Sequence, residues 1–212
     1  MNNVIGVCGL IGSGKGTVAD ILVQNFQYEK ISFADKLKDG VSAVFGWDRE
    51  LLEGDTDRSR LWRERTDEFW TKETGAEVSP RLILQLFGTD CMRSGFFDGI
   101  WVSLVKQQLI QNPTKNFVIP DVRFSNEINL IKELDGEVWQ VCRGEKPMWF
   151  VTAVGINEAD ATYVEHNSMA VIFPEVHISE WAWVANDDKF DAIIKNNSTL
   201  EDLKSQVLSH LA

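Results

Sequence analysis

Short apolar runs alternate with amphipathic segments along this chain. The first run is Val4–Cys8, and similar runs lie at 30–33, 117–119, 137–142 and 192–194. After the first run, apolar residues recur with the three-to-four spacing of a helix, at Val18, Ile21, Leu22 and Phe26. Short strands that alternate with helices predict an α/β fold, in which a five-stranded parallel sheet is flanked by helices on both faces.

Three further helices are indicated by capping residues and apolar stripes. A helix from Pro80 to Asp90 has Ser79 as its expected N-cap and a proline in its first position. A second spans 125–134. The last is expected to begin at Ser198, where Glu201 three residues later would complete a capping box. Its stripe consists of Leu200, Leu203, Val207 and Leu211.

Two stretches interrupt this rhythm, at about 48–78 and at 144–190. The first is charged and carries Trp62 and Trp70, whereas the second is long, weakly periodic and rich in Trp, Asn and Asp. A chain of 212 residues does not demand a second core, because domains of ~150 residues are typical. We therefore expect a single domain over 1–212, with these stretches as insertions on one edge of the sheet.

Composition narrows the classes of partner. The chain has 44% hydrophobic and 25% charged residues, which is ordinary for a globular protein. Its net charge of −11 argues against a nucleic-acid or anionic-membrane surface, since both need clustered Lys and Arg. Small phosphorylated ligands need only a local positive site. No membrane-spanning run or leader pattern is visible, and the three cysteines form no disulfide framework, so a reduced, cytoplasmic protein is expected.

The strongest chemical signal is a glycine-rich loop directly after the first strand. Gly9, Gly12, Ser13, Gly14, Lys15, Gly16 and Thr17 lie between that strand and the following helix. Glycines let backbone N–H groups approach a phosphate closely, and the helix N-terminus adds its positive dipole end. Lys15 would add a point charge at the β- and γ-phosphates of ATP. The alternative is a plain strand-to-helix turn with a surface lysine.

The order of residues after the lysine is informative. Gly16 follows Lys15, and the hydroxyl comes one position later at Thr17. This form resembles the loop of nucleoside monophosphate kinases such as adenylate kinase, whereas in motor and switch NTPases the hydroxyl directly follows the lysine. The loop therefore favours a small-molecule kinase.

A kinase must also hold a second phosphorylated substrate. Lys36 and Lys38 lie at the start of a predicted helix, and Asp121 and Arg123 follow the third predicted strand. Ligands of open α/β sheets bind at the carboxyl ends of strands. The alternatives are a solvated helix face for the lysines and a structural ion pair for Asp121 with Arg123.

Several blocks resemble the bacteriophage deoxynucleoside monophosphate kinases. These are Arg81 to Asp90 (RLILQLFGTD), Trp101-Val102, and Pro120-Asp121-Val122-Arg123 with Glu127. The phosphate loop, the Lys38 segment and the closing residues 196–200 extend the match over most of the chain. The resemblance implies a P-loop kinase fold with NMP-binding and lid insertions.

The same resemblance implies the reaction and its residues. The γ-phosphoryl group of ATP would pass to a deoxynucleoside 5′-monophosphate (dNMP) for DNA precursor synthesis, with Mg²⁺ as cofactor. Residues that match the acceptor site are Lys38, Arg81, Gly88, Thr89, Trp101, Asp121, Arg123 and Glu127, and Gln85 could read a base edge. Arg143 resembles an arginine near the ATP adenine, although it could be a plain surface residue. His177 to Glu180 resembles a lid element, although residues 148–176 are longer and more apolar than such a lid.

Lys15, Asp121 and Arg123 are thus the expected catalytic residues. The acceptor phosphate is already deprotonated at neutral pH, so no strong general base is required, and positioning with charge stabilisation should suffice. Two alternatives stay open: another small-molecule P-loop kinase, such as a dephospho-coenzyme A kinase, and an ATP-binding module without phosphotransfer. The sequence leaves the accepted bases, the metal ligands and a homodimeric state undecided.

Overall fold

The computed structural model describes residues 3–158 and 169–211. The chain forms two compact units. Unit 1 comprises Met1–Ser32 and Gln108–Ala212, and unit 2 is the continuous segment Phe33–Gln107. Helix α6 (Ile100–Gln111) begins in unit 2 and ends in unit 1. Part of the predicted 144–190 insertion, residues 159–168, lies outside the described residues.

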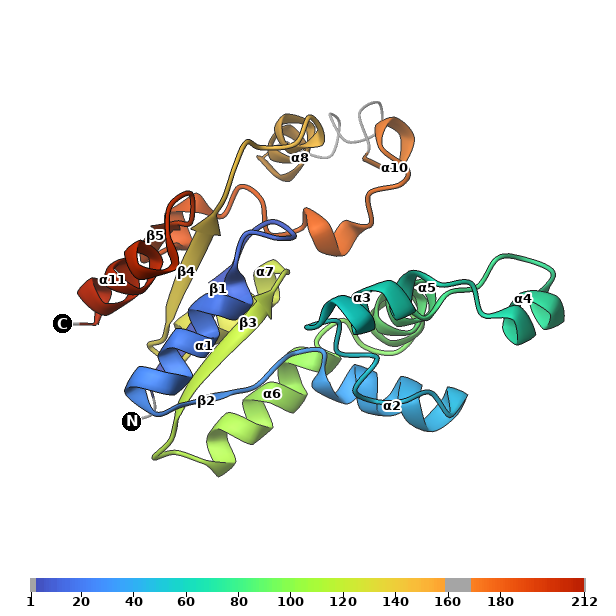
Figure 1. Ribbon diagram of the computed structural model, residues 1–212, viewed down its shortest axis with the longest axis horizontal. Helices are drawn as coiled ribbons and strands as arrows, with labels where there is room; N and C mark the ends of the chain where they lie inside the picture. Colours follow the sequence, from blue (N-terminus) through green and yellow to red (C-terminus); the bar gives the residue numbers. More distant parts are fainter. Residues whose placement is uncertain (1–2, 159–168, 212) are drawn as a thin grey trace. The chain divides into compact units, whose positions relative to one another are not determined.

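Unit 1 is built on the predicted five-stranded parallel sheet, with strand order β2-β3-β1-β4-β5 (Figure 1). Its strands are β1 (Val4–Cys8), β2 (Tyr28–Lys30), β3 (Asn116–Val122), β4 (Glu137–Cys142) and β5 (Ala192–Lys195). Its helices and helical turns are α1 (Lys15–Phe26), α7 (Ser125–Glu133), α8 (Trp149–Glu158), α10 (Met169–Ile172), η2 (Ile178–Glu180), η3 (Asp187–Lys189) and α11 (Leu200–His210).

Side chains that alternate along the strands bury against different helices. On one face, Ile5 and Val7 of β1 belong to a buried cluster with Leu22 of α1 and Leu203 of α11. On the other, α7 packs closely over Gly6, since a Cβ there would lie 2.3 Å from Ile131 Cδ1 of that helix and would displace this side chain. Helices therefore cover both faces of the sheet, as the alternation of strands and helices predicts.

This topology marks one edge of unit 1 as the place for a ligand. The loop after β1 leads to α1 on one face, and the loop after β3 leads to α7 on the opposite face. Since β1 and β3 are neighbours in the sheet, their loops diverge at the carboxyl ends of the two strands. Open α/β sheets bind ligands at such a switch point.

Unit 2 is helical. It contains α2 (Asp35–Phe45), α3 (Asp57–Glu64), α4 (Glu68–Thr74), α5 (Pro80–Gln85), the π-helix η1 (Leu86–Ser94) and the start of α6. The predicted cap of α5 is confirmed, because Ser79 Oγ accepts a hydrogen bond from the Leu82 N–H at 3.2 Å. The predicted α-helix ends earlier than expected, since the chain widens to a π-helix at Leu86.

Two other boundaries differ from the prediction. The second strand was expected at 30–33 but lies at Tyr28–Lys30, although the Ile31 N–H still donates to the Val118 carbonyl. The last helix is capped by Thr199 with Asp202, one residue beyond the predicted Ser198 and Glu201. Both pairs satisfy the capping-box pattern. The sequence alone does not choose between them.

Several of the tryptophans pack with other aromatic residues. In unit 2, Trp47 stacks on Phe45 at a centroid distance of 4.6 Å, and Trp62 and Trp70 join the group edge-on. In unit 1, Trp183 is buried beside Phe150. The predicted 48–78 insertion thus contributes two rings to an aromatic cluster. Within the described residues, no helix is long and apolar enough to span a bilayer.

Candidate active site

The glycine-rich loop has the backbone geometry that its sequence demands. Gly9, Gly12 and Gly14 have φ values of 144°, 73° and 104°, in the region that disfavours side chains. Helix α1 begins at Lys15, directly after Gly14. Lys15 Nζ donates to the carbonyl oxygens of Gly9 and Leu10, each at 2.8 Å. The lysine is therefore held over the loop, at the positive end of the helix.

The charge on Lys15 is tuned by its surroundings. Burial, with the nearby charge of Arg123 second, lowers the pKa of Lys15 to about 8. Glu180 and Asp121 act in the opposite direction on that pKa. The loop lysine thus shares one electrostatic environment with groups that follow β3 and with a residue far along the chain.

Asn196 fastens the loop from the end of β5. Its Nδ2 donates to the Ser13 carbonyl at 2.8 Å, and its backbone N–H donates to the Cys142 carbonyl at 2.8 Å. A Cβ at Gly14 would lie 2.3 Å from that Nδ2. The glycine at this position is therefore required both for its positive φ and for the approach of the amide.

A β-bulge shapes the end of β3. Gly6 of β1 pairs with Ile119, but Cys8 pairs with Val122, so β3 carries one extra residue. The bulge falls at Pro120-Asp121, where proline has no N–H to donate to a ladder. Ser32 Oγ donates to Asp121 Oδ2 at 2.6 Å. The carboxylate is consequently oriented by both the bulge and the serine.

Glu127 fixes the backbone that carries Arg123. It is buried at the first turn of α7, and its Oε2 accepts hydrogen bonds from the N–H groups of Arg123 (2.7 Å) and Phe124 (3.1 Å). These contacts satisfy N–H groups at the start of the helix. Glu127 is therefore placed to support Arg123.

The guanidinium of Arg123 meets the predicted lid element. Arg123 Nη1 donates to Glu180 Oε1 at 2.6 Å and to the Ser179 carbonyl at 3.2 Å. Burial by itself would lower the pKa of Arg123, but Glu180, Asp121 and Glu127 outweigh burial and raise it. The arginine thus keeps its charge in a half-buried position.

The residues that directly follow β4 are more exposed to solvent than those after β3. Arg143 directly follows β4 and is exposed, and the Gly144 N–H donates to Asn197 Oδ1 at 2.8 Å. Helix α8 buries Phe150, Ala153 and Ile156, so part of the 144–190 segment is packed rather than exposed.

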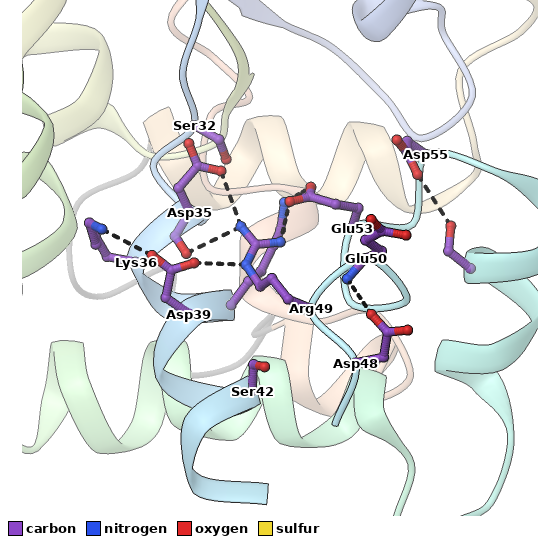
Figure 2. A network of polar contacts seen from close by, with 12 residues as sticks. Ser32, Asp35, Lys36, Asp39, Ser42, Asp48, Arg49, Glu50, Glu53 and Asp55 are labelled. Carbon is purple, nitrogen blue, oxygen red and sulfur yellow. Dashed lines mark hydrogen bonds and ion pairs between the residues drawn. The ribbon is translucent and has the colours of Figure 1, made fainter. Parts of the chain in front are cut away.

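In unit 2, Lys38 belongs to an ion-pair network. Lys38 Nζ lies 2.5 Å from Glu53 Oε2, and its side chain is only 12% exposed. Glu53 also pairs with Arg49, whose guanidinium reaches Asp39 at 2.8 Å and Asp35 at 3.6 Å (Figure 2). Burial alone would raise the pKa of Glu53, but Lys38 and Arg49 lower it overall. The lysine is therefore held in a fixed place on α2.

The Gly88-Thr89 pair lies inside the π-helix η1. Trp101 of α6 is buried, and its Nε1 donates to the Gly88 carbonyl at 2.9 Å. A Cβ at Gly88 would lie 2.9 Å from Leu37 Cδ2 of α2, so glycine permits close packing here. Such π-helical turns are frequent at functional sites. Trp101 thus holds the backbone of the π-helix η1 at Gly88.

Arg81 and Gln85 are half-buried on α5, one turn apart. Arg81 Nη1 donates to Glu64 Oε1 of α3 at 3.2 Å. The acceptor residues predicted between 38 and 101 therefore all belong to unit 2, whereas Asp121, Arg123 and Glu127 belong to unit 1. Among the described residues, no three His, Cys, Asp or Glu side chains gather as a metal site.

A sequence model of the deoxynucleotide monophosphate kinase family matches residues 59–171. The chain belongs to this family. The RLILQLFGTD and Pro-Asp-x-Arg blocks predicted a kinase that uses deoxynucleotides. This match confirms the prediction for the family and for the class of enzyme.

Two curated relatives agree with the family assignment. A protein of Acanthamoeba polyphaga mimivirus, provisionally named a deoxynucleotide monophosphate kinase, is 28% identical over 97% of this chain and 94% of its own length. The deoxynucleoside-5′-monophosphate kinase of Escherichia phage T5 is 28% identical over 63% of this chain and 73% of its own.

Solved structures show more distant likenesses. A dephospho-CoA kinase from Campylobacter jejuni has a TM-score of 0.42 with 14% identity, covering 99% of this chain and 96% of that one. A shikimate kinase from Aquifex aeolicus has a TM-score of 0.41 with 12% identity, covering 98% and 95%. A likeness this distant does not bear on the activity of this family member.

The contact of Asn196 with the loop and the pairing of Glu180 with Arg123 were not predicted from the sequence. Asn196 stands at the end of β5, so its place after a strand was a signal that could have drawn attention to it. Glu180 is 57 residues from Arg123, and only its opposite charge hinted at the pairing.

Proposed function

We propose that this kinase transfers the γ-phosphoryl group of ATP to a deoxynucleoside 5′-monophosphate, giving a deoxynucleoside diphosphate and ADP. The observation that best supports this proposal is the grouping of Lys15, Asp121 and Arg123, where the loops after β1 and β3 diverge. Two cations and a carboxylate beside a glycine-rich helix N-terminus suit phosphate chemistry.

ATP is assigned to the loop of unit 1. The N–H groups of residues 12–17, comprising Gly12, Ser13, Gly14, Lys15, Gly16 and Thr17, would surround the β- and γ-phosphates. Lys15 lies over this loop and would exchange its carbonyl partners for phosphate oxygens. Arg143, exposed after β4, would contact the adenine side of ATP.

The acceptor dNMP is assigned to the residues that resemble the family pattern. In unit 2 these are Lys38, Arg81, Gln85, Gly88, Thr89 and Trp101. We assign them different tasks: Lys38 and Arg81 would supply charge, Gln85 would supply an amide for the base, and Trp101, whose Nε1 donates to the Gly88 carbonyl, would hold that glycine. From unit 1, Arg123 would bind the acceptor phosphate, with Asp121 and Glu127 as its supports.

The chemistry requires charge compensation more than proton transfer. Two anionic nucleotides repel each other, and Lys15 and Arg123 would offset that repulsion as charge moves during transfer. The acceptor phosphate oxygen is ionised at neutral pH and attacks without a base. Asp121 would therefore act by orientation: its carboxylate is held by Ser32, and after Glu180 it is a further negative charge near the Arg123 guanidinium.

A divalent ion, which we propose to be Mg²⁺, fits the donors present. Mg²⁺ in kinases is held by nucleotide phosphates, waters and one or two protein oxygens. Thr17, exposed in the first turn of α1, and Asp121 would supply those oxygens. When bound, the ion neutralises phosphate charge.

The relatives from a phage and a giant virus support a role in viral DNA precursor synthesis in the cytoplasm of the host.

The test is ADP release measured by a coupled assay with each of the four dNMPs and their ribonucleotide counterparts. A kinase should be nearly silent until an acceptor is added, and should produce one dNDP for each ADP. Steady ATP hydrolysis that no acceptor accelerates would contradict the proposal and indicate an ATPase instead.

A further inference from the structure

The turn η2 is a self-capped structure. His177 precedes Ile178–Glu180, and its Nδ1 accepts a hydrogen bond from the Ser179 N–H at 3.3 Å. The same Nδ1 lies 2.9 Å from Ser179 Oγ. These contacts close the turn on itself, so the direction of the Glu180 side chain is set by a defined backbone.

The turn is also anchored to the core of unit 1. Trp183 is 3% exposed, packs at 6.1 Å from the ring of Phe150, and donates through Nε1 to the Glu180 carbonyl at 2.9 Å. Asn157 of α8 donates to the carbonyl oxygens of Trp181 (3.1 Å) and Val184 (2.9 Å). Glu180 is therefore carried by a fixed support and is itself only 15% exposed.

The guanidinium of Arg123 is engaged on one side only. Its hydrogen bonds to described residues both leave from Nη1, toward Glu180 Oε1 and the Ser179 carbonyl. Within the described chain, Nε and Nη2 have no hydrogen-bond acceptor, and 34% of the side chain is exposed. Those two nitrogens form one edge of the guanidinium plane, which is the edge that can bind two oxygens of a phosphate together.

We propose that Glu180 is a positioning residue, which holds Nη1 of Arg123 so that the Nε–Nη2 edge is presented to the phosphate of the acceptor nucleotide. The inference rests on the proposed function, in which Arg123 binds that phosphate. A free arginine side chain has several rotatable bonds, and ordering it costs conformational entropy. Because Glu180 orders the Arg123 side chain before the nucleotide binds, less conformational entropy is lost on binding, as in other preorganised sites.

Kinetics of five variants test this assignment. Glu180→Ala should lower kcat/KM for the dNMP by about 20-fold, the size expected for a lost charge-assisted hydrogen bond, with KM for ATP changed less than about twofold. Glu180→Gln keeps an acceptor oxygen and should lose only about three- to fivefold. Glu175→Ala is the matched control, since Glu175 is exposed in the same segment and should behave as wild type.

The double variant decides whether Glu180 acts through Arg123. In an Arg123→Ala background, adding Glu180→Ala should cost almost nothing further, because the residue to be positioned is gone. Additive losses would overturn the proposal. So would a Glu180→Ala enzyme that binds dNMP as well as wild type or more tightly, which would make Glu180 a competitor of the phosphate. Melting temperatures confirm that each variant is folded.

A measurement without turnover separates this proposal from the proposed function. In ¹⁵N-arginine-labelled protein, the Nε–H signal of Arg123, assigned by its loss in Arg123→Ala, should shift with inorganic phosphate, and Glu180→Ala should weaken that response about tenfold. An unchanged response would overturn the positioning role. Wild-type enzyme that phosphorylates no dNMP would instead refute the proposed function, whatever the signal does.

Discussion

Asn196 Nδ2 donates a hydrogen bond to the carbonyl oxygen of Ser13 at 2.8 Å, which joins the end of the last strand to the glycine-rich loop. The two residues are 183 positions apart. A loop that must present its N–H groups to phosphates gains from being fixed before the nucleotide arrives. The bond to Asn196 fixes the loop at the residue before Gly14.

Asn196→Ala should therefore raise KM for ATP about fivefold, the equivalent of one net hydrogen bond of about 1 kcal/mol, while KM for the dNMP stays within twofold. Gln206→Ala is the control, since Gln206 also bonds the end of β5, at the backbone of Lys195, while its hydrogen bonds within the described residues do not include the loop. Equal changes in KM for ATP in the two variants would mean that only the stability of β5 matters.

Lys15→Ala should abolish phosphotransfer and leave the protein folded. Among the described residues, the hydrogen bonds of Lys15 Nζ go to carbonyl oxygens of its own loop, so the substitution should leave the fold intact, whereas the charge would be needed on the phosphates during transfer. Single-turnover assays and circular dichroism check the two halves of this prediction. A folded variant that retains turnover within a factor of a few would show that the loop is not the ATP site.

Activity should also depend on the protonation of Lys15. Its pKa is lowered to about 8, first by burial and then by Arg123, and the cationic form is the one that binds phosphates. As pH rises through about 8 the free enzyme loses that charge, so kcat/KM for ATP should fall. In Arg123→Gln the fall should move to higher pH, because one cause of the lowered pKa is removed. A pH profile that is flat from 7 to 10 would contradict this expectation.

Lys38→Met should raise KM for the dNMP at least tenfold, because a held cation on α2 is removed from the acceptor residues. Lys36→Met is a close control, since Lys36 is on the same helix, is 65% exposed and forms its ion pair within the described residues with Asp39. The control should keep the KM of the wild type, as surface ion pairs contribute little. If both variants lose affinity equally, the effect is the general charge of α2 rather than a binding contact.

The three thiols should react at very different rates. Cys91 is exposed, whereas Cys8 is buried in β1, where burial raises its pKa to about 12. Burial also raises the pKa of Cys142, which is half-buried. Because the thiolate is the reactive form, a disulfide reagent at pH 7.5 should modify Cys91 first and Cys8 only after unfolding. Mass spectrometry of the native protein identifies the modified residue.

The features that sequence predicts well here are local ones. The glycine-rich loop, the Ser79 cap and the four apolar strands β1, β3, β4 and β5 depend on neighbouring residues, so a short window contains their cause. The π-helix at Leu86–Ser94 is contacted at Gly88 by Trp101 and Leu37, which are distant in the sequence. An α-helical pattern cannot reveal that widening.

Non-local pairing limits the prediction of the site as well. The bulge at Pro120 could be suspected, since proline cannot serve a central strand, but the direction it gives to Asp121 could not. Glu180, which pairs with the Arg123 guanidinium, and Asn196, which bonds Ser13, both come from the last third of the chain, where charged and amide side chains are common. Their selection depends on where η2 and β5 end in the folded unit.

The division of the chain has a consequence for its synthesis. Strand β1 is completed within the first residues, yet both strands that pair with it, β3 and β4, come after the whole of unit 2. Unit 2 is continuous and can pack as it leaves the ribosome, while the apolar Val4–Cys8 segment waits without sheet partners. Nascent chains that stop before Asn116 should therefore be the ones that chaperones hold, and release should follow once β3 is available to pair.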